Sequence, residues 1–376
     1  MLAVLCPGQG SQSPGFLEPW LEFPATRSSL AALSVAAGFD LERAGVDRDA
    51  DVVDTAVAQP LIAAAGLVSA GLLEPLPDEL VVVGHSIGEI TAAAIAGVFE
   101  NRQALALAAS RGRAMAEAAA AEPSGMVAVL GGDADAVAAA IARNGCWVAN
   151  HNAAGQVVAA GALAGLQRLA TDLSSGARLR PLPVAGAFHT PLMSAAQAPF
   201  AAAVRALPIR DPALTLLSNA DGSTVASGAE VVERLVAQIV APVRFDRCLD
   251  TLRALGVTAT IELAPAGVLT ALVRRALPGV HAIALRSLAD VDAARALFAS
   301  ATSGSPTWSE PWRLVVSPAR GTFRIGPGRL GTVRSRAGDV LVAGPAPGRV
   351  LEWLVEDGDP ITTGQPVARV LPEMAE

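Results

Sequence analysis

Up to about residue 290, short apolar runs of strand length alternate with longer segments whose apolar residues recur at helical spacing. This alternation is typical of an α/β fold with a mostly parallel sheet. The expected helices include Arg102–Ala120 and Val231–Ile239. The expected buried strands are Leu2–Cys6, Leu80–Gly84, Ala213–Leu217, Val257–Leu263 and His281–Leu285.

The region from 121 to 187 departs from this pattern. It predicts a strand, a helix, a β-hairpin, a second helix and a strand, at Met126–Leu130, Ala134–Arg143, Cys146–Ala160, Leu163–Leu173 and Ala177–Pro183. That βαββαβ order is the ferredoxin-like pattern. We therefore expect an inserted ferredoxin-like small domain at 121–187. The large hydrolase-like α/β domain would comprise 1–120 and 188–300.

The composition changes again after residue 302. Residues 303–319 are rich in Ser, Pro and Gly and are expected to form a linker. Residues 320–376 show short strands and turn signals without a clear helix. This predicts a small β-rich C-terminal module.

Charge and hydropathy narrow the function classes. A net charge of −7 argues against a nucleic-acid partner, because phosphate contacts need a basic surface. No apolar run reaches the ~18 residues that suggest a membrane span. No basic segment precedes an apolar one at the N-terminus. We therefore expect no membrane insertion and a cytoplasmic location.

The cysteines and the basic residues bear on cofactors. Cys6, Cys146 and Cys248 are widely spaced and odd in number, which favours free thiols over a disulfide framework or a metal site. The sequence contains no lysine, so a lysine-linked cofactor is not possible. We expect neither a metal nor a cofactor.

A candidate nucleophile follows the expected strand Leu80–Gly84. Gly84-His85-Ser86-Ile87-Gly88 is a G-x-S-x-G sequence before a helix expected at Glu89–Val98. Such a turn strains the serine, exposes its hydroxyl and directs the amide of Ile87 toward a substrate oxygen. The alternative is an ordinary tight turn with a capping serine. The strand–turn–helix context favours the nucleophile.

Two histidines are candidates for its base. His189 lies on a loop directly before Thr190 and Pro191, which are typical of the N-cap and first position of a helix. His151, in the expected small domain, is the rival. The residues alone leave this choice open.

Arg111 is a third candidate. It lies in an alanine- and leucine-rich helical stretch, one turn from Leu107 and Met115, and therefore faces inward. A buried guanidinium without a partner is costly, so it must meet an acid or a bound anion. An internal salt bridge is the alternative to a substrate role.

These residues together resemble the malonyl-CoA:acyl carrier protein transacylase family, which includes the acyltransferase domains of fatty acid and polyketide synthases. The similarity covers residue 1 to about 290, with the motifs in the right order. They are Pro7-Gly8-Gln9-Gly10-Ser11-Gln12, Ala58-Gln59-Pro60, Gly84-His85-Ser86-Ile87-Gly88-Glu89, Arg111-Gly112 with Met115, Asn150-His151-Asn152 followed by Gly155-Gln156-Val157-Val158, Gly186-Ala187-Phe188-His189, Ser218-Asn219, and Gln238 to Val243. One motif departs from the family: Ala264 and Ala266 replace the glycines of its E-x-G-P-G, which puts the shape of that turn in question but not the chemistry.

The resemblance implies catalytic roles. Ser86 would attack the thioester of malonyl-CoA, with His189 as general base. The main-chain carbonyl of Gln238 would orient the histidine in place of a carboxylate. The backbone amides of Gln9 and Ile87 would hold the oxyanion.

The resemblance also implies how substrates bind. Arg111 would pair with the free carboxylate of malonate, and Phe188 would narrow the pocket beside the malonyl α-carbon. Family members with Phe before the histidine resemble malonyl enzymes, whereas methylmalonyl enzymes usually carry Ser. The expected partners are malonyl-CoA, coenzyme A and acyl carrier protein. Further substrate contacts are expected from Gln59, His85, Met115, Asn150 and Asn152.

The C-terminal segment resembles half of a biotinyl- or lipoyl-type carrier domain. The resemblance rests on Gly344–Val350, Gly358–Ile361 and Pro372–Glu376. Ala375 stands where such domains carry the modified lysine. We therefore expect a degenerate module without a prosthetic group.

Other functions remain open. A lipase- or esterase-like hydrolase would share the elbow, but neutral esters need no buried cation such as Arg111. A non-enzymatic carrier or scaffold would fit the C-terminal module but not the intact set of Ser86, His189 and Arg111. A transacylase of the same fold that serves polyketide synthesis or malonate decarboxylation would fit every motif.

Overall fold

The structure is a computed structural model that describes residues 1–49, 51–173, 176–302, 313–326, 329–335, 338–342, 348–363 and 365–372. The chain divides into two units, Met1–Gly304 and Ser305–Glu376, and each is described by itself. Most of the expected linker, the stretch 344–347 and Ala375 lie outside the described residues.

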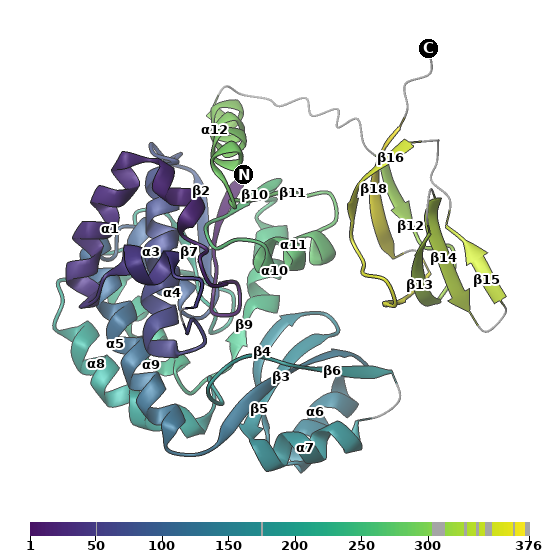
Figure 1. The fold of residues 1–376 in the computed structure, drawn as a ribbon, viewed down its shortest axis with the longest axis horizontal. Coiled ribbons are helices and arrows are strands. Elements are labelled where there is room, and N and C mark those ends of the chain that lie inside the picture. Colours follow the sequence, from purple (N-terminus) through teal and green to yellow (C-terminus); the bar gives the residue numbers. More distant parts are fainter. Residues whose placement is uncertain are drawn as a thin grey trace. The chain divides into compact units, whose positions relative to one another are not determined.

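Six strands form the central sheet of the first unit, in the order β11-β10-β1-β2-β7-β8 (Figure 1). The pairings from β11 through to β7 are all parallel, and β8 adds an antiparallel edge. The sheet confirms the predicted α/β fold class. The strands are β1 Leu2–Cys6, β2 Leu80–Gly84, β7 Thr215–Leu217, β8 Thr224–Val225, β10 Ala259–Glu262 and β11 His281–Ala284.

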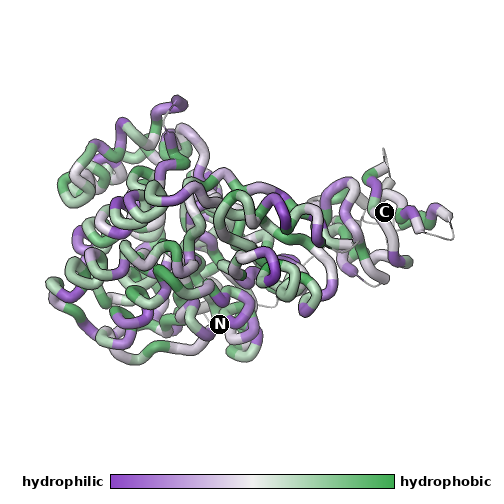
Figure 2. The backbone as a smooth tube through the Cα atoms, turned by 90° about the horizontal axis from the view of Figure 1, so that it is seen from below, coloured by the Kyte–Doolittle hydropathy of each residue, from purple (hydrophilic) through white to green (hydrophobic). Residues whose placement is uncertain are grey.

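Helices cover both faces of this sheet, and its central strands β1 and β2 contain only apolar residues and glycine. Along β1, Leu2, Val4 and Cys6 pack into one buried cluster, whereas Ala3 and Leu5 pack into another. On the first face lie η1 Glu18–Glu22, α1 Pro24–Ala37, α2 Leu41–Val46, α3 Thr55–Gly71, α4 Gly88–Ile95, α5 Asn101–Ala120, η2 Pro191–Ala196, α8 Gln197–Arg205, α9 Gly228–Gln238 and α12 Leu288–Thr302. On the second lie α10 Phe245–Ala254 and α11 Val268–Ala276. Hydrophobic and hydrophilic residues alternate along the helical coils, as one-sided burial requires (Figure 2).

A second, smaller sheet follows α5, with the strand order β6-β3-β5-β4-β9. The chain order β3-α6-β4-β5-α7-β6 is the predicted ferredoxin-like pattern, with its own apolar cluster. The strand β9 (Val243–Arg244), which comes later in the chain, pairs with β4 and ties this sheet to the large part of the unit. The elements are β3 Ser124–Gly131, α6 Ala134–Arg143, β4 Trp147–Ala153, β5 Gln156–Ala162, α7 Leu163–Asp172 and β6 Ala177–Pro181.

One boundary beside the nucleophile was predicted wrongly. The helix expected to run to Val98 ends at Ile95. Gly97 takes the left-handed conformation, with φ 86°, and the amide of Val98 bonds back to the carbonyl of Ala93. A glycine in this conformation commonly ends a helix. The hydrophobic pattern continues to Val98, past the end of the helix, which is why it predicted too long a helix.

The second unit is rich in β-structure. Its strands form a three-stranded sheet, β12-β18-β16, and a four-stranded sheet, β15-β14-β13-β17. Phe323, Val333 and Val367 are fully buried in a core that is separate from those of the first unit. The strands are β12 Arg313–Val316, β13 Gly321–Gly326, β14 Arg329–Ser335, β15 Gly338–Leu341, β16 Gly348–Trp353, β17 Pro360–Ile361 and β18 Pro366–Pro372.

Candidate active site

The turn between β2 and α4 has the geometry of a nucleophile elbow. Ser86 lies at φ 55°, a left-handed conformation that costs a non-glycine residue about 1–3 kcal/mol. The flanking glycines leave the necessary room. A Cβ on Gly84 would lie 2.1 Å from the carbonyl carbon of Gly88, and a Cβ on Gly88 would lie 2.1 Å from the carbonyl oxygen of Cys6. The turn therefore needs glycine at both positions.

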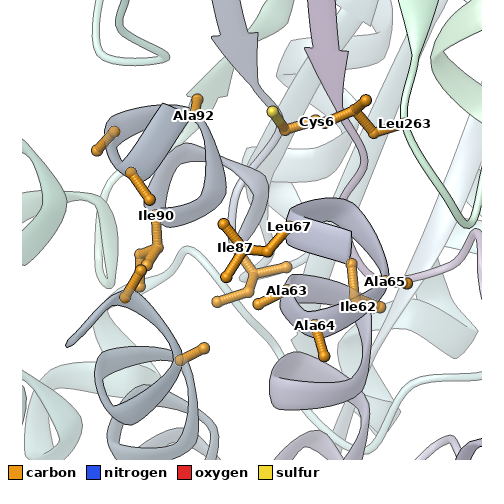
Figure 3. Close-up of a cluster of buried hydrophobic side chains, with 14 of the residues drawn as sticks. Cys6, Ile62, Ala63, Ala64, Ala65, Leu67, Ile87, Ile90, Ala92 and Leu263 are labelled. Carbon is orange, nitrogen blue, oxygen red and sulfur yellow. The ribbon is translucent and has the colours of Figure 1, made fainter. Parts of the chain in front are cut away.

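The strained turn is held from both sides. The side chain of Ile87 is buried and points toward Leu67 and Ala63 of α3 (Figure 3). On the other side, Asn219 Oδ1 accepts a hydrogen bond from the Ser86 amide at 2.8 Å, and its Nδ2 donates to the Gly84 carbonyl at 2.7 Å. The sequence motif indicated the turn but not the role of Asn219 in holding it.

The turn leaves an amide free for a substrate oxygen. The amides of Gly88 and Glu89 bond to the carbonyls of His85 and Ser86. The amide of Ile87, at the start of α4, donates no hydrogen bond within the described residues. The same holds for the amide of Gln9, whose side chain donates to the Val53 carbonyl at 3.2 Å. Both amides remain candidates for the oxyanion hole.

His189 makes the hydrogen bond to the serine. Its Nε2 lies 2.7 Å from Ser86 Oγ, and its Nδ1 lies 2.9 Å from the main-chain oxygen of Gln238. Because a carbonyl only accepts, Nδ1 carries the proton and Nε2 is the free base. Burial, with the nearby charge of Arg111, lowers the pKa of His189 to about 3. The imidazole is therefore neutral at physiological pH and able to take the serine proton.

Arg111 is buried in α5 and faces the same serine. One guanidinium nitrogen donates to Gln59 Oε1 at 2.9 Å. The other donates to Gln238 Oε1 at 3.2 Å and to Ser86 Oγ at 3.3 Å. Burial lowers its pKa to about 10, so it stays charged at neutral pH. All three hydrogen-bond acceptors of the guanidinium are uncharged oxygens. Arg111 therefore does not form the internal salt bridge that was the alternative to a substrate role.

Glu89 is the residue whose role the sequence analysis missed. It lies on the first turn of α4, is buried, and accepts hydrogen bonds from the Asn219 amide at 2.7 Å and from the side-chain amide of Gln238. Burial raises its pKa to about 7, although Arg111 opposes the shift. The final Glu of the G-H-S-x-G-E motif was a signal that could have identified it.

A second cluster of polar side chains lies around His85 of the elbow. Its Nε2 lies 3.0 Å from Asn152 Oδ1 and 3.4 Å from Asn150 Nδ2, both on β4 of the small sheet. Burial lowers the pKa of His85. The buried Asn150 Oδ1 has no hydrogen-bond partner in the described chain, so it is free to bind a donor. These three residues therefore join the small sheet to the elbow.

Three further candidate residues of the site are Met115, Phe188 and His151. Met115 is buried, and its sulfur lies 3.5 Å from Gln59 Nε2, which fixes the direction of the Gln59 amide. Phe188 is buried in the main apolar cluster directly before His189. His151, the rival base, lies on β4 opposite Arg244 of β9, and the ring nitrogen within hydrogen-bond distance of Ser86 Oγ belongs to His189 instead. In the described chain, no group of three or more His, Cys, Asp or Glu is arranged to hold a metal ion.

The fold and the elbow define an α/β enzyme class with a serine nucleophile between a strand and a helix. The chain belongs to the acyl transferase domain family, which it matches over residues 4–295. The second unit lies outside this match.

Relatives include the malonyl CoA-acyl carrier protein transacylase of Mycobacterium tuberculosis, which is 49% identical over 297 residues, covering 78% of this chain and 98% of that protein. The protein of the same name from Bacillus subtilis is 33% identical, covering 73% and 90%. The crystal structure of MCAT from M. tuberculosis matches with a TM-score of 0.75, covering 78% of this chain and 99% of that one. An acyl-carrier-protein S-malonyltransferase structure from Burkholderia pseudomallei, 32% identical, gives 0.73 with the same coverage.

Proposed function

We propose that the protein transfers the malonyl group of malonyl-CoA to the phosphopantetheine thiol of an acyl carrier protein. The observation that carries this function is the position of the Arg111 guanidinium, 3.3 Å from the hydroxyl of Ser86. A buried cation beside a serine nucleophile suits an acyl group that carries its own carboxylate. The names of the relatives support the same substrates.

The first half of the reaction forms an ester on the enzyme. Ser86 Oγ attacks the thioester carbonyl while His189 Nε2 takes its proton. The oxyanion is held by the amides of Ile87 and Gln9. The C–S bond then breaks, and His189 returns the proton to the sulfur of coenzyme A.

The second half reverses these steps with a new thiol. The carrier protein's thiol gives its proton to His189 and attacks the malonyl ester. The ester C–O bond breaks, and Ser86 Oγ regains the proton from His189. With its pKa at about 3, the His189 imidazole is neutral before each half-reaction, which leaves Nε2 unprotonated for the proton of Ser86 or of the thiol.

Arg111 selects the acyl group. On binding, the malonyl carboxylate would form a charge-assisted pair with the guanidinium, which the Gln59 and Gln238 oxygens hold beside Ser86. Phe188 would limit substituents on the α-carbon, while Gln59, Met115, His85, Asn150 and Asn152 shape the rest of the pocket. We place this reaction in fatty acid synthesis, with polyketide synthesis as the alternative.

The organisation of the chain is part of the proposal. A large domain, 1–120 and 188–300, would carry the catalytic residues, and the small domain 121–187 would close one side of the pocket through Asn150 and Asn152. The expected linker 303–319 is too long at its C-terminal end, because β12, Arg313–Val316, already pairs with β18 in the second unit. Residues 303–312 would link the two domains to this module, which would carry no prosthetic group. No helix in the described ranges is long and apolar enough to cross a membrane. We propose a cytoplasmic location.

The competing function is hydrolysis. Incubation with malonyl-CoA and holo carrier protein separates the two, because malonyl-carrier protein and free malonate can be measured in one reaction. We expect the thioester to accumulate at the expense of malonyl-CoA, with little free malonate. Release of malonate at the same rate with and without carrier protein would contradict transfer.

A further inference from the structure

Gln238 connects three parts of the active site. Its main-chain oxygen accepts from His189 Nδ1, its side-chain oxygen accepts from Arg111, and its side-chain nitrogen donates to Glu89. The amide must present its oxygen, and not its nitrogen, toward the guanidinium, because guanidinium groups only donate. A neighbouring side chain must therefore fix the direction of the Gln238 amide.

Glu89 fixes the direction of the Gln238 side-chain amide. An ionised carboxylate only accepts, so the Gln238 nitrogen must face it and the oxygen must face Arg111. Asn219 Oδ1, 3.4 Å from the same nitrogen, favours the same direction. Asn219 is itself fixed, since it accepts from the Ser86 amide and donates to the Gly84 carbonyl. The pKa of Glu89, raised by burial to about 7, leaves a substantial ionised fraction at neutral pH.

We infer that Glu89 is a positioning and specificity-determining residue, which orients the Gln238 amide so that Arg111 is held beside Ser86 for an acyl carboxylate. This rests on the proposed malonyl transfer. Glu89 touches neither the substrate nor the reacting atoms, and it acts through Gln238. Its loss should therefore impair the carboxylate-bearing acyl group more than a neutral one.

The substitution Glu89→Gln tests this with little change in shape. The one remaining oxygen can still accept from the main-chain amide of Asn219, which cannot turn over. The new NH₂ group would then face the Gln238 nitrogen, donor against donor. If Gln238 turns over to relieve this contact, its nitrogen faces Arg111 instead. If Gln238 instead moves away from the new NH₂ group without turning over, its oxygen is drawn away from the guanidinium. In both cases the contact between Arg111 and the Gln238 oxygen is lost or weakened, while the contact with Gln59 remains.

The measurement is kcat/KM for malonyl-CoA and for acetyl-CoA, with the full-length chain and holo carrier protein. We expect the malonyl-to-acetyl ratio to fall by about tenfold or more in Glu89→Gln, the size of losing one hydrogen bond to a charged group. Acetyl transfer should change less than about threefold, because the elbow keeps its Asn219 anchor. An equal loss for both substrates, or no loss, would overturn the inference.

A second variant covers the case in which Glu89→Gln does not fold. Gln238→Met keeps the main-chain carbonyl that orients His189 but removes the side-chain oxygen that faces Arg111. The ratio should fall to a similar extent, and the double variant should show no further fall because both act on one contact. A ratio that stays at the wild-type value in Gln238→Met would contradict the mechanism on its own.

Glu262 offers a matched control. Its carboxylate is also fully buried, and it accepts from the amides of Gly267, Leu269 and Thr270 at the start of α11. Glu262→Gln should lower the melting temperature but leave the malonyl-to-acetyl ratio unchanged. A fall in the ratio here would mean that any buried charge affects selectivity and would overturn the assignment to Glu89. Failure of the wild type to accept malonyl-CoA would instead refute the proposed function.

Discussion

The two units of the chain differ sharply in what they bury. In the first, Gln59, Glu89, Arg111, Asn219 and Gln238 are all buried around one serine and connected by hydrogen bonds. In the described part of the second unit, the core is apolar and Ser317 is the one buried polar residue. Burying polar groups costs free energy unless they are paired, so a dense network of this kind marks a functional site.

This difference predicts which substitutions should affect catalysis and which should affect only folding. In the first unit, a buried polar side chain can be changed with a specific effect on one substrate or one step. In the second unit, comparable changes should affect only its own folding.

The largest effect is expected at the base. Replacing His189 by alanine removes the group that takes the serine proton, which is worth about 10²–10⁴-fold in rate. Acyl transfer assays check this, with His281→Ala, at the exposed start of β11, as the control that keeps full activity. A loss in His189→Ala no larger than in the control would exclude the role.

Arg111 should come next, with an effect that depends on the substrate. Arg111→Ala should lower kcat/KM for malonyl-CoA by about 100-fold or more, because a charged, water-excluded pair is lost. Acetyl-CoA should be affected much less. Arg113→Ala, an exposed position on the same helix, is the matched control. Equal losses for both substrates would rule out a carboxylate-binding role.

A smaller effect is expected from pH. Between about pH 8 and pH 5.5, the malonyl-to-acetyl ratio should decline as Glu89, with a pKa of about 7, becomes protonated on the acid side. His189, at about 3, stays neutral over this range. The other titratable groups that face Glu89 do not change charge in this range. Arg111 in α5 has a pKa of about 10, and burial raises the pKa of Cys248 in α10. The hydrogen bond to Asp221 raises the pKa of Arg234 in α9. A ratio that is flat with pH would separate Glu89 from selectivity.

The sequence predicts local features of this site well. Helical periodicity alone places Arg111 on the inward face of its helix, and the G-x-S-x-G pattern locates the elbow. Both depend on residues close together in the chain. The parallel sheet was likewise predictable from the alternation of apolar runs and helical segments.

Features that depend on distant parts of the chain were not predictable in this way. Glu89 is three residues from Ser86, but its partners Asn219 and Gln238 lie 130 and 149 residues further on. Only the order of strands in the sheet and the position of α9 bring them together. The choice between His151 and His189 was open from the residues for the same reason, until folding set one of them 2.7 Å from the serine.

The smallest effect is expected from the second unit. Deleting residues 303–376 should change kcat/KM for malonyl transfer by less than about threefold, because the polar network lies wholly in the first unit. Kinetics of the purified truncated chain, with its melting curve, provide the check. A truncated protein that folds but cannot transfer malonyl would show that the second unit contributes to catalysis.

The most direct test of the serine mechanism is the intact mass of the enzyme after brief incubation with malonyl-CoA and no carrier protein. The wild type should gain the mass of one malonyl group, located on Ser86 by peptide mapping, and should lose it when holo carrier protein is added. Ser86→Ala should gain none. Transfer at the wild-type rate by Ser86→Ala, or turnover by the wild type with the adduct on another residue, would contradict a malonyl–Ser86 intermediate.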